Sequence, residues 1–275
     1  MKSGRSKDTL SGVTAESQFR TYASPLVEEA LQHAHELEQS DDAETLHKLR
    51  IALRRLRSLF WAYRPILDDA FDDKQRALLR YLAQAAGSTR DWDILIELMS
   101  EHEDTDLAQA LRGHRDAALR TSKATLNNAD IKGVLREAVA EANRELNTAK
   151  KRVAIEQFAS DRVRNARRQL KKRIKRVRQV KRPEYAALHE VRKAGKKVRY
   201  LMEFFMPLLA EKERGGLKQL KRLQKHLGAL NDVVASRDLL DKSDALPNAA
   251  AAKPALRTLK KQQKRRMKQA LKSLR

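Results

Sequence analysis

Two stretches of the chain, LHKLRIALRRLR (46–57) and LHEVRKAGKKVR (188–199), align without gaps at a spacing of 142 residues. Apolar residues recur in both at intervals of three and four, which is the spacing of one face of an α-helix. A second correspondence, at a spacing of 141, joins LLRYLAQAAGSTRDWDIL (78–95) to QLKRLQKHLGALNDVVAS (219–236). The chain therefore reads as two copies of one helical unit of about 130 residues.

Each copy predicts four main helices. They span about 16–39, 44–64, 69–102 (broken at Gly87) and 106–126, then 155–180, 185–210, 214–242 (broken at Gly228) and 253–274. ESQF (16–19) resembles IEQF (155–158), so each copy begins just before these residues. We expect a flexible N-terminus (1–14), a first repeat (15–127), a connecting helix (128–151) and a second repeat (152–275), with 243–254 as a loop. No segment alternates like a strand, so the predicted fold is all-α, with two four-helix bundles related by a pseudo-twofold axis.

The two glycines predict how the long helices break. Gly87 and Gly228 suit the left-handed position that ends a helix. Ser88 or Asn231 would then cap the next segment. Asp91 and Asp232 would lie near its positive end.

Positive charge is concentrated in one half of the sequence. Residues 1–150 hold 22 Lys and Arg against 25 Asp and Glu, a net charge of −3, whereas residues 151–275 hold 37 against 11, a net charge of +26. Such a half-chain repels itself unless a polyanion or counterions neutralise it. The candidate partners are a nucleic acid, an anionic membrane or a phosphate polymer.

Several function classes are excluded or disfavoured by composition. The chain has no cysteine, so it forms no disulfide, no thiolate zinc site and no cysteine nucleophile. No apolar run approaches the ~20 residues that span a bilayer, and no secretory signal is recognisable. The expectation is a soluble, cytoplasmic protein.

The basic residues of the two aligned stretches form stripes. His47, Arg50, Arg54 and Arg57 are spaced by 0, 3, 7 and 10, which places them on one helix face about 100° from the leucine stripe. His189, Arg192, Lys196 and Arg199 repeat this pattern. Like charges on successive turns are costly in an isolated helix. Arginines that only flank a core and reach for water are the alternative, but repetition at the same four positions favours an anion-binding role.

The duplicated H-x-x-R-x-x-x-R/K-x-x-R helix, followed by L-G-x-x-R/N-D, resembles the CHAD domain family (conserved histidine α-helical domain) over about residues 15–275. The resemblance implies two four-helix bundles, a basic central channel or groove, and binding of inorganic polyphosphate, with association with polyphosphate granules. Carried over by position, the anion-binding candidates are His47, Arg50, Arg54, Arg55, Arg57, His189, Arg192, Lys196, Lys197 and Arg199. The predicted polyphosphate-binding set is completed by the nearby cations Arg76, Arg80, Lys193, Lys218 and Lys221.

This sequence departs from the family pattern at two positions. Gly195 stands where Leu53 stands in the first copy, which weakens the second helix locally. Asn231 stands where the first copy has Arg90, so a contact there would exist in one copy only.

The predicted function is non-catalytic polyphosphate binding, with no cofactor. RNA or another nucleic acid is the alternative partner. Single-strand binders stack bases on aromatic platforms, yet only 5% of residues are aromatic, and Trp61, Tyr63, Phe204 and Phe205 fall at core positions. Histidine phosphotransfer is less favoured, because an acceptor histidine needs open access. His47 and His189 have no carboxylate at ligand spacing, so no metal site is predicted.

Overall fold

A computed structural model of the chain describes residues 12–39, 42–100, 105–242 and 249–274. Within these ranges the regular elements are all helices, which confirms the all-α prediction. The α-helices are α1 (Ala15–Gln39), α2 (Ala43–Tyr63), α3 (Asp69–Ala85), α4 (Ser88–Met99), α5 (Thr105–Asn127), α6 (Ile131–Thr148), α7 (Ile155–Gln179), α8 (Tyr185–Phe205), α9 (Glu211–Arg214), α10 (Leu217–Lys242) and α11 (Ala249–Ser273). Short 3₁₀ turns follow α2 (Arg64–Ile66) and α8 (Met206–Leu208).

Several helices begin or end at other residues than predicted. Helix α8 ends at Phe205, five residues before the predicted end, because Pro207 lies in the 3₁₀ turn that follows. Helix α11 begins at Ala249, inside the predicted loop 243–254. The remainder of that loop (243–248), residues 1–11 of the predicted N-terminus, and the predicted helix end at 102 lie outside the described residues.

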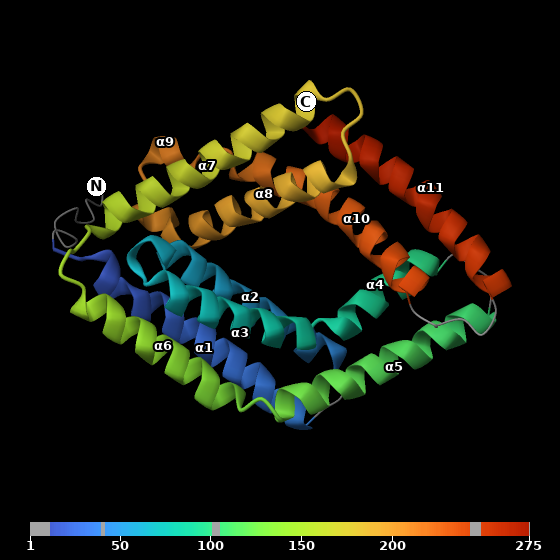
Figure 1. The fold of residues 1–275 in the computed structure, drawn as a ribbon, viewed down its shortest axis with the longest axis horizontal. Helices are drawn as coiled ribbons and strands as arrows, with labels where there is room; N and C mark the ends of the chain where they lie inside the picture. The colour runs from blue at the N-terminus through green and yellow to red at the C-terminus, as the bar shows by residue number, and fades with distance from the viewer. Residues whose placement is uncertain (1–11, 40–41, 101–104, 243–248, 275) are drawn as a thin grey trace, which may run out of the picture.

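The helices form two layers that meet along α2 and α8 (Figure 1). Helices α1, α2 and α3 pack together, and α6 lies on the outer side of α1. Helices α7, α8 and the first half of α10 make the corresponding group. A third group combines helices from both predicted copies. In it, α4 and α5 of the first copy pack against the second half of α10 and against α11. Its separate apolar cluster includes Trp92, Leu95, Leu111, Val233 and Leu259.

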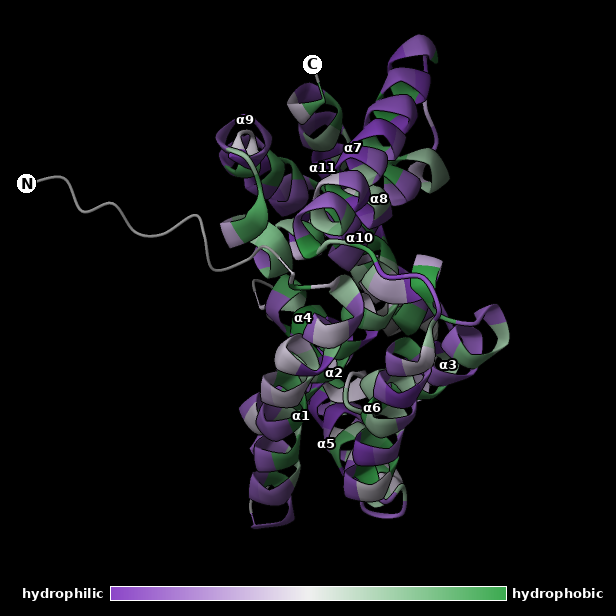
Figure 2. Cartoon of the chain, turned by 90° about the vertical axis from the view of Figure 1, so that its left-hand side faces the viewer, coloured by the Kyte–Doolittle hydropathy of each residue, from purple (hydrophilic) through white to green (hydrophobic). Residues whose placement is uncertain are grey.

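Corresponding helices have equal lengths. Helices α2 and α8 each hold 21 residues and start 142 positions apart, while α1 and α7 each hold 25 and start 140 apart. Buried residues of α1 and α7 coincide at that spacing, as with Ala23 and Val163 or Leu37 and Val177. The structural register therefore differs by one residue from the ESQF and IEQF match at 139. Figure 2 colours most residues of α7 as hydrophilic, in keeping with the many Lys and Arg residues of this helix.

The two glycine positions behave differently. The chain does break between α3 and α4, but Gly87 has φ −115°, so it is not left-handed as predicted. Glycine leaves room there for the Arg50 guanidinium, because a Cβ would lie 2.5 Å from Nη1 of Arg50 and displace it. Ser88 does not cap α4, since its hydroxyl donates to the Ala85 carbonyl. The predicted break at Gly228 is wrong: α10 runs through it as one helix.

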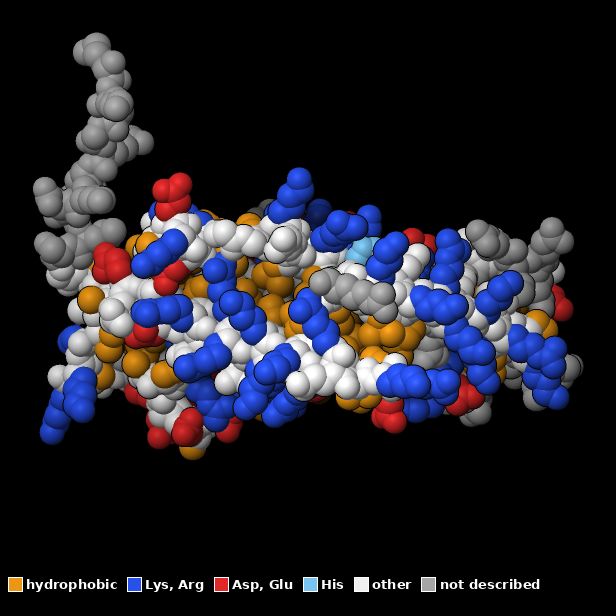
Figure 3. All heavy atoms as spheres, turned by 90° about the horizontal axis from the view of Figure 1, so that it is seen from above, with side chains coloured by type: hydrophobic (Ala, Val, Ile, Leu, Met, Phe, Trp, Pro, Cys, Tyr) orange, Lys and Arg blue, Asp and Glu red, His pale blue; other side chains and the backbone are white. Residues whose placement is uncertain are grey.

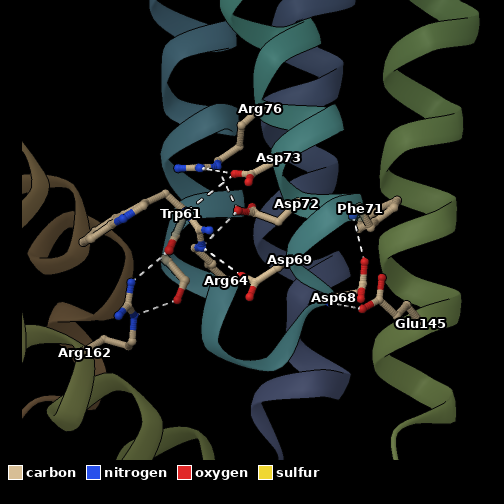
Figure 4. A network of polar contacts seen from close by, with 11 residues as sticks. Trp61, Arg64, Asp68, Asp69, Phe71, Asp72, Asp73, Arg76, Glu145 and Arg162 are labelled. Carbon is tan, nitrogen blue, oxygen red and sulfur yellow. Dashed lines mark hydrogen bonds and ion pairs between the residues drawn. The ribbon is translucent and has the colours of Figure 1, made fainter.

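An aromatic and polar seam joins the two layers at the end of α2. The rings of Tyr63 and Phe158 lie 5.1 Å apart. Arg162 of α7 donates to the carbonyls of Trp61 and Ala62 at 2.9 and 2.8 Å, which satisfies carbonyls left free at a helix end. Burial lowers the pKa of Arg162 to about 10. Figure 4 shows the contacts of Arg162 with the end of α2, beside the carboxylates at the start of α3.

Candidate anion-binding site between the histidine helices

Helices α2 and α8 bring the two predicted stripes face to face. Leu46, Leu49, Leu53, Leu56 and Phe60 of α2 are at most 1% exposed, so the apolar stripe is buried as predicted. The neighbouring face of α2 points toward α8, where Nη2 of Arg54 donates to the Tyr200 hydroxyl at 2.9 Å. The basic residues of both helices therefore border the same space.

That space contains a first cavity of about 420 Å³ between α2, α4, α8 and α10. Its cations come from both histidine helices and from α4, and two carboxylates and an amide also reach it. The polar lining residues are His47, Arg50, Arg54, Arg57, Arg90, Asp91, Arg192, Lys196, Asn231, Asp232 and Ser236.

A second cavity of about 500 Å³ adjoins the first and shares four of its cations. Eight Lys and Arg side chains line it, together with His189, and no carboxylate does. These cations are Arg54, Arg57, Arg76, Arg80, Arg192, Lys193, Lys196 and Lys197. A water-filled space with this lining has a strongly positive potential, so it concentrates anions.

A third cavity of about 490 Å³ extends along the other side of α2 and α8. It contains Arg54 again, with His47, Arg55, Arg199 and Tyr200, and one carboxylate, Glu203. Arg54 lines all three cavities, so it marks the point at which they meet.

The structure thus gathers thirteen of the fifteen predicted residues around these cavities. The two that it places elsewhere are Lys218 and Lys221, which are exposed near the start of α10 and line none of the three. Helical spacing put both beside the apolar face of α10, but the side of that face on which they lie depends on how α10 packs against α8.

Several of the gathered cations already have partners. Arg50 donates to the Gly87 carbonyl at 2.8 Å and pairs with Asp91 at 3.3 Å. Arg55 pairs with Glu29 of α1 at 2.9 Å. Arg199 pairs with Glu203 at 3.1 Å, and Lys193 pairs with Glu190.

Arg76 is the most firmly held of these cations. It pairs with Asp72 and Asp73, both at 2.8 Å, and Figure 4 shows all three beside Arg64. Asp72 is fully buried, and burial raises the pKa of its carboxyl although Arg76 and Arg64 act against this. Removing Arg76 would leave a buried carboxylate without its nearest cation, so this residue supports the fold as well as lining the second cavity.

Arg192 and Lys196 differ from these, because neither makes a hydrogen bond or ion pair with any part of the chain that the structure describes. Burial, then the charges of Arg54, Arg192, Arg199 and Arg50, lowers the pKa of Lys196 to about 7. Burial is also the main cause that lowers the pKa of Arg192, and the nearby Asp232 opposes it. Two cations of the second copy are therefore held in the cavities at a cost that a bound anion would relieve.

The two histidines have unequal surroundings. His189 Nδ1 lies 3.2 Å from both the Tyr185 hydroxyl and the Asn231 side-chain oxygen. His47 Nδ1 is buried without a hydrogen-bond partner. Burial and nearby cations lower the pKa of both imidazoles, so both are neutral at pH 7 when no anion is bound.

Sequence reasoning missed two features of the site. Tyr200 lies eleven positions after His189, which is almost the same helix face, and that spacing alone could have identified it. Asn231 was expected to leave one corner without a contact, but its amide oxygen instead accepts from Tyr185 at 3.1 Å. That link depends on the packing of α8 against α10, which no local pattern reports.

Other binding chemistries have little support in the described ranges. No group of three or more His, Asp or Glu side chains is close enough there to hold a metal ion. No described helix is both long and apolar enough to cross a membrane.

Comparisons with known proteins agree with this architecture. The sequence profile of the CHAD domain matches residues 21–241. The solved CHAD domain from the plant Ricinus communis superposes with a TM-score of 0.81 at 24% identity, covering 95% of this chain and 92% of that one. PptA from Streptomyces chartreusis superposes with a TM-score of 0.63 at 14% identity, covering 95% and 96%. No curated protein matches the chain. At these identities the two structures show the fold alone.

Proposed function

The chain belongs to the CHAD domain family, and on that premise we propose that it binds inorganic polyphosphate in the cavities between α2 and α8 without catalysing a reaction. Binding of polyphosphate is a general property of this family. The observation that carries the proposal for this chain is the second cavity, where eight Lys and Arg side chains meet with no carboxylate among them.

Multivalent electrostatics supports this binding mode. Arginine offers planar, forked donors to phosphate oxygens, and lysine offers a mobile point charge. The three cavities share Arg54, so a chain of phosphates could pass from one to the next and contact cations of both helices. No single residue makes such a site, and we expect affinity to fall stepwise as cations are removed.

The aromatic residues disfavour the nucleic-acid alternative. Phe19, Phe60, Tyr63 and Phe205 are fully buried. Trp61 borders the second cavity, but Lys197 and Arg162 both lie over its ring at 4.6 Å. A ring covered in this way offers little surface for base stacking, whereas polyphosphate has no bases to stack.

The geometry also disfavours phosphotransfer. A phosphoacceptor histidine needs an open approach for an in-line donor. His189 is held by Tyr185 and Asn231, and His47 has a buried Nδ1. Incubation with a phosphodonor should therefore leave both histidines unlabelled, which mass spectrometry of the intact protein would check.

A competition experiment tests the proposal. Labelled polyphosphate is titrated across a salt series, and the logarithm of affinity should fall with a slope of about −4 to −7 for six to ten neutralised phosphates. Unlabelled polyphosphate should compete better than single-stranded RNA of equal charge. Equal competition per charge would favour the nucleic-acid alternative, and a flat salt response would overturn the electrostatic mechanism.

We further propose that the protein is cytoplasmic and gathers at polyphosphate granules. A fluorescent fusion should co-localise with granules. The same fusion carrying Arg192→Glu and Lys196→Glu should be diffuse, since these changes reverse the charge of two unpaired cations in the cavities.

A further inference from the structure

A separate groove of about 740 Å³ lies on the opposite side of α8, between α7 and α10. Its floor is apolar and is made by α7, α8 and α10 together. The apolar lining residues are Leu170, Ile174, Val198, Met202, Leu220, Leu223 and Leu274. Figure 3 shows apolar side chains on this face of the molecule, between rows of Lys and Arg.

All the charged residues that line the groove are basic. Arg167, Lys171, Arg178, Arg222 and Lys272 line it, and no carboxylate does. Arg167 donates to the Gly215 carbonyl and Arg178 to the Leu274 carbonyl, both at 2.6 Å, so these two fix the ends of neighbouring segments. Lys171, Arg222 and Lys272 are exposed and make no hydrogen bond or ion pair with the described parts of the chain.

In the first copy, helix α6 covers the position that corresponds to this groove. Helix α6 lies against α1 and reaches α3, where Glu141 accepts from Gln75 at 3.1 Å and Glu145 contacts the Asp68 amide. The apolar face of α6, made by Leu135, Ala138, Val139, Ala142 and Leu146, is at most 9% exposed. Its three basic residues, Lys132, Arg136 and Arg144, all face solvent. An amphipathic helix with two of its three carboxylates, Glu141 and Glu145, toward the bundle thus completes the first group.

The groove and the corresponding position on α1 differ in charge at matching residues. At the spacing of 140 that relates α1 to α7, Arg167 and Lys171 correspond to Val27 and Leu31, while Leu170 and Ile174 correspond to Ala30 and Ala34. The matching position on α1 therefore has apolar edges and is covered by α6. The groove keeps an apolar floor but has cations at its edges, and no described element of the chain lies over it as α6 lies over α1.

From this comparison we infer that the groove between α7 and α10 is a docking site for an amphipathic α-helix of a partner protein, with an apolar stripe for the floor and carboxylates along its edges. Apolar surface on the floor supplies non-directional affinity. Lys171, Arg222 and Lys272 can each pair with a carboxylate at the edge of the partner helix. These pairs would set the orientation of the helix in the groove and favour acidic helices over basic ones. The inference does not depend on polyphosphate binding, since the two sites share no lining residue.

A designed peptide tests the inference without knowledge of the natural partner. The probe is a fluorescent peptide of residues 131–148 carrying Lys132→Glu, Arg136→Glu and Arg144→Glu, which keeps the apolar stripe of α6 and makes its charged positions acidic. Its comparison peptide has the same composition in an order that scatters the apolar residues. Fluorescence anisotropy with the full chain at 0.15 M salt should show saturable binding of the probe and at least about tenfold weaker binding of the scattered peptide.

Matched variants locate the binding. Lys171→Glu with Arg222→Glu should raise the dissociation constant of the probe at least about tenfold. Lys132→Glu with Arg136→Glu, on the solvent face of α6 in the full chain, changes the formal charge equally and should leave it within about twofold. Arg192→Glu with Lys196→Glu should also leave it unchanged, although that variant loses polyphosphate. Circular dichroism establishes that each variant is helical.

Four results would overturn the inference. Equal binding of the two peptides, or equal loss in the rim and α6 variants, would mean that only net charge attracts the probe. Displacement of the probe by laurate at submicellar concentration, together with failure of the scattered peptide to bind, would assign the groove to an anionic amphiphile instead. A wild-type dimer that the rim variant converts to a monomer, in sedimentation without peptide, would assign it to a second copy of the chain.

Discussion

The histidine helices α2 and α8 have the same length and the same basic stripe, yet their cations are treated differently. In α2, Arg50 is held by Asp91 and the Gly87 carbonyl, and Arg55 by Glu29. In α8, Arg192 and Lys196 lack such partners within the described residues, and Lys196 has a pKa of about 7. Neither helix is uniform, since Lys193 and Arg199 of α8 are paired and Arg57 of α2 has no hydrogen bond or ion pair with the described residues. We expect an external anion to bind the buried cations that lack a partner, of which Arg192 and Lys196 are adjacent on α8.

Charge reversal on the two helices gives the largest expected effect. Arg192→Glu with Lys196→Glu should weaken polyphosphate binding on the order of 100-fold, because two desolvated phosphate contacts become repulsive. Arg50→Glu with Arg54→Glu should also weaken binding strongly, but less, since Arg50 already shares its charge with Asp91. Filter binding at fixed salt ranks the variants.

The control for that ranking is Lys132→Glu with Arg136→Glu on exposed α6. It changes the formal charge by the same amount and should cost at most about threefold through the weaker long-range field. If the control lost as much affinity as the α8 pair, position would not matter and net charge alone would explain binding.

Lys196 should also make stability depend on pH. An unfolded lysine titrates near 10.4, whereas Lys196 in the fold titrates at about 7. Between these values the unfolded chain holds more protons, so the free energy of unfolding rises as pH increases from 7 to 10. Lys196→Met should remove roughly 3 kcal/mol of that rise, which is the difference in bound protons summed over this pH range. Urea unfolding across the pH series measures it.

Arg54 is the matched position on α2, since an arginine keeps its charge throughout this range. Arg54→Met should keep most of the slope between pH 7 and 10 and lower it only in part, because burial is the main cause of the lowered Lys196 pKa and the charge of Arg54 comes second. If the free energy of unfolding of the wild-type protein did not rise between pH 7 and 10, Lys196 would not be a buried cation without a partner, as described for α8.

The two aligned glycines provide a smaller and opposite pair of effects. In Gly87→Ala the new Cβ would lie 2.5 Å from Nη1 of Arg50, so Arg50 must leave its contacts with the Gly87 carbonyl and Asp91, at a cost of about 1 kcal/mol. Gly228→Ala meets nothing within 4 Å inside a continuous helix, so it should stabilise by about 0.5–1 kcal/mol. Thermal unfolding of the two variants would give shifts of opposite sign. Shifts of the same sign would mean that Arg50 is not held as described.

The smallest effect is expected at the start of α10. Lys218→Gln with Lys221→Gln should change polyphosphate affinity by less than about threefold, because both side chains lie outside the three cavities and act only through the screened field. A loss comparable with that of the α8 pair would extend the binding surface onto α10.

The sequence by itself determined the helices and their buried faces. Periodicity at three and four residues is a local property, so it placed the leucine stripe of α2 and the basic stripes of both histidine helices correctly. The difference in net charge between residues 1–150 and residues 151–275 likewise follows from composition alone. The break predicted at Gly228 failed because one glycine costs a helix only about 1 kcal/mol, and the packing of α10 against α4, α8 and α11 outweighs that. At Gly87 the chain does break, but with φ −115° in place of the predicted left-handed cap.

Only the tertiary structure decided which cations are neutralised and which remain available. Asp91 reaches Arg50 across 41 positions, and Tyr200 reaches Arg54 across 146. The same is true of Lys171, which is exposed on α7 and lies at the rim of a groove only because α8 and α10 pack beside α7. A stripe fixes the direction of a side chain from its own helix, but the charge, burial and pKa of its end group depend on whatever other helices bring to within a few ångströms.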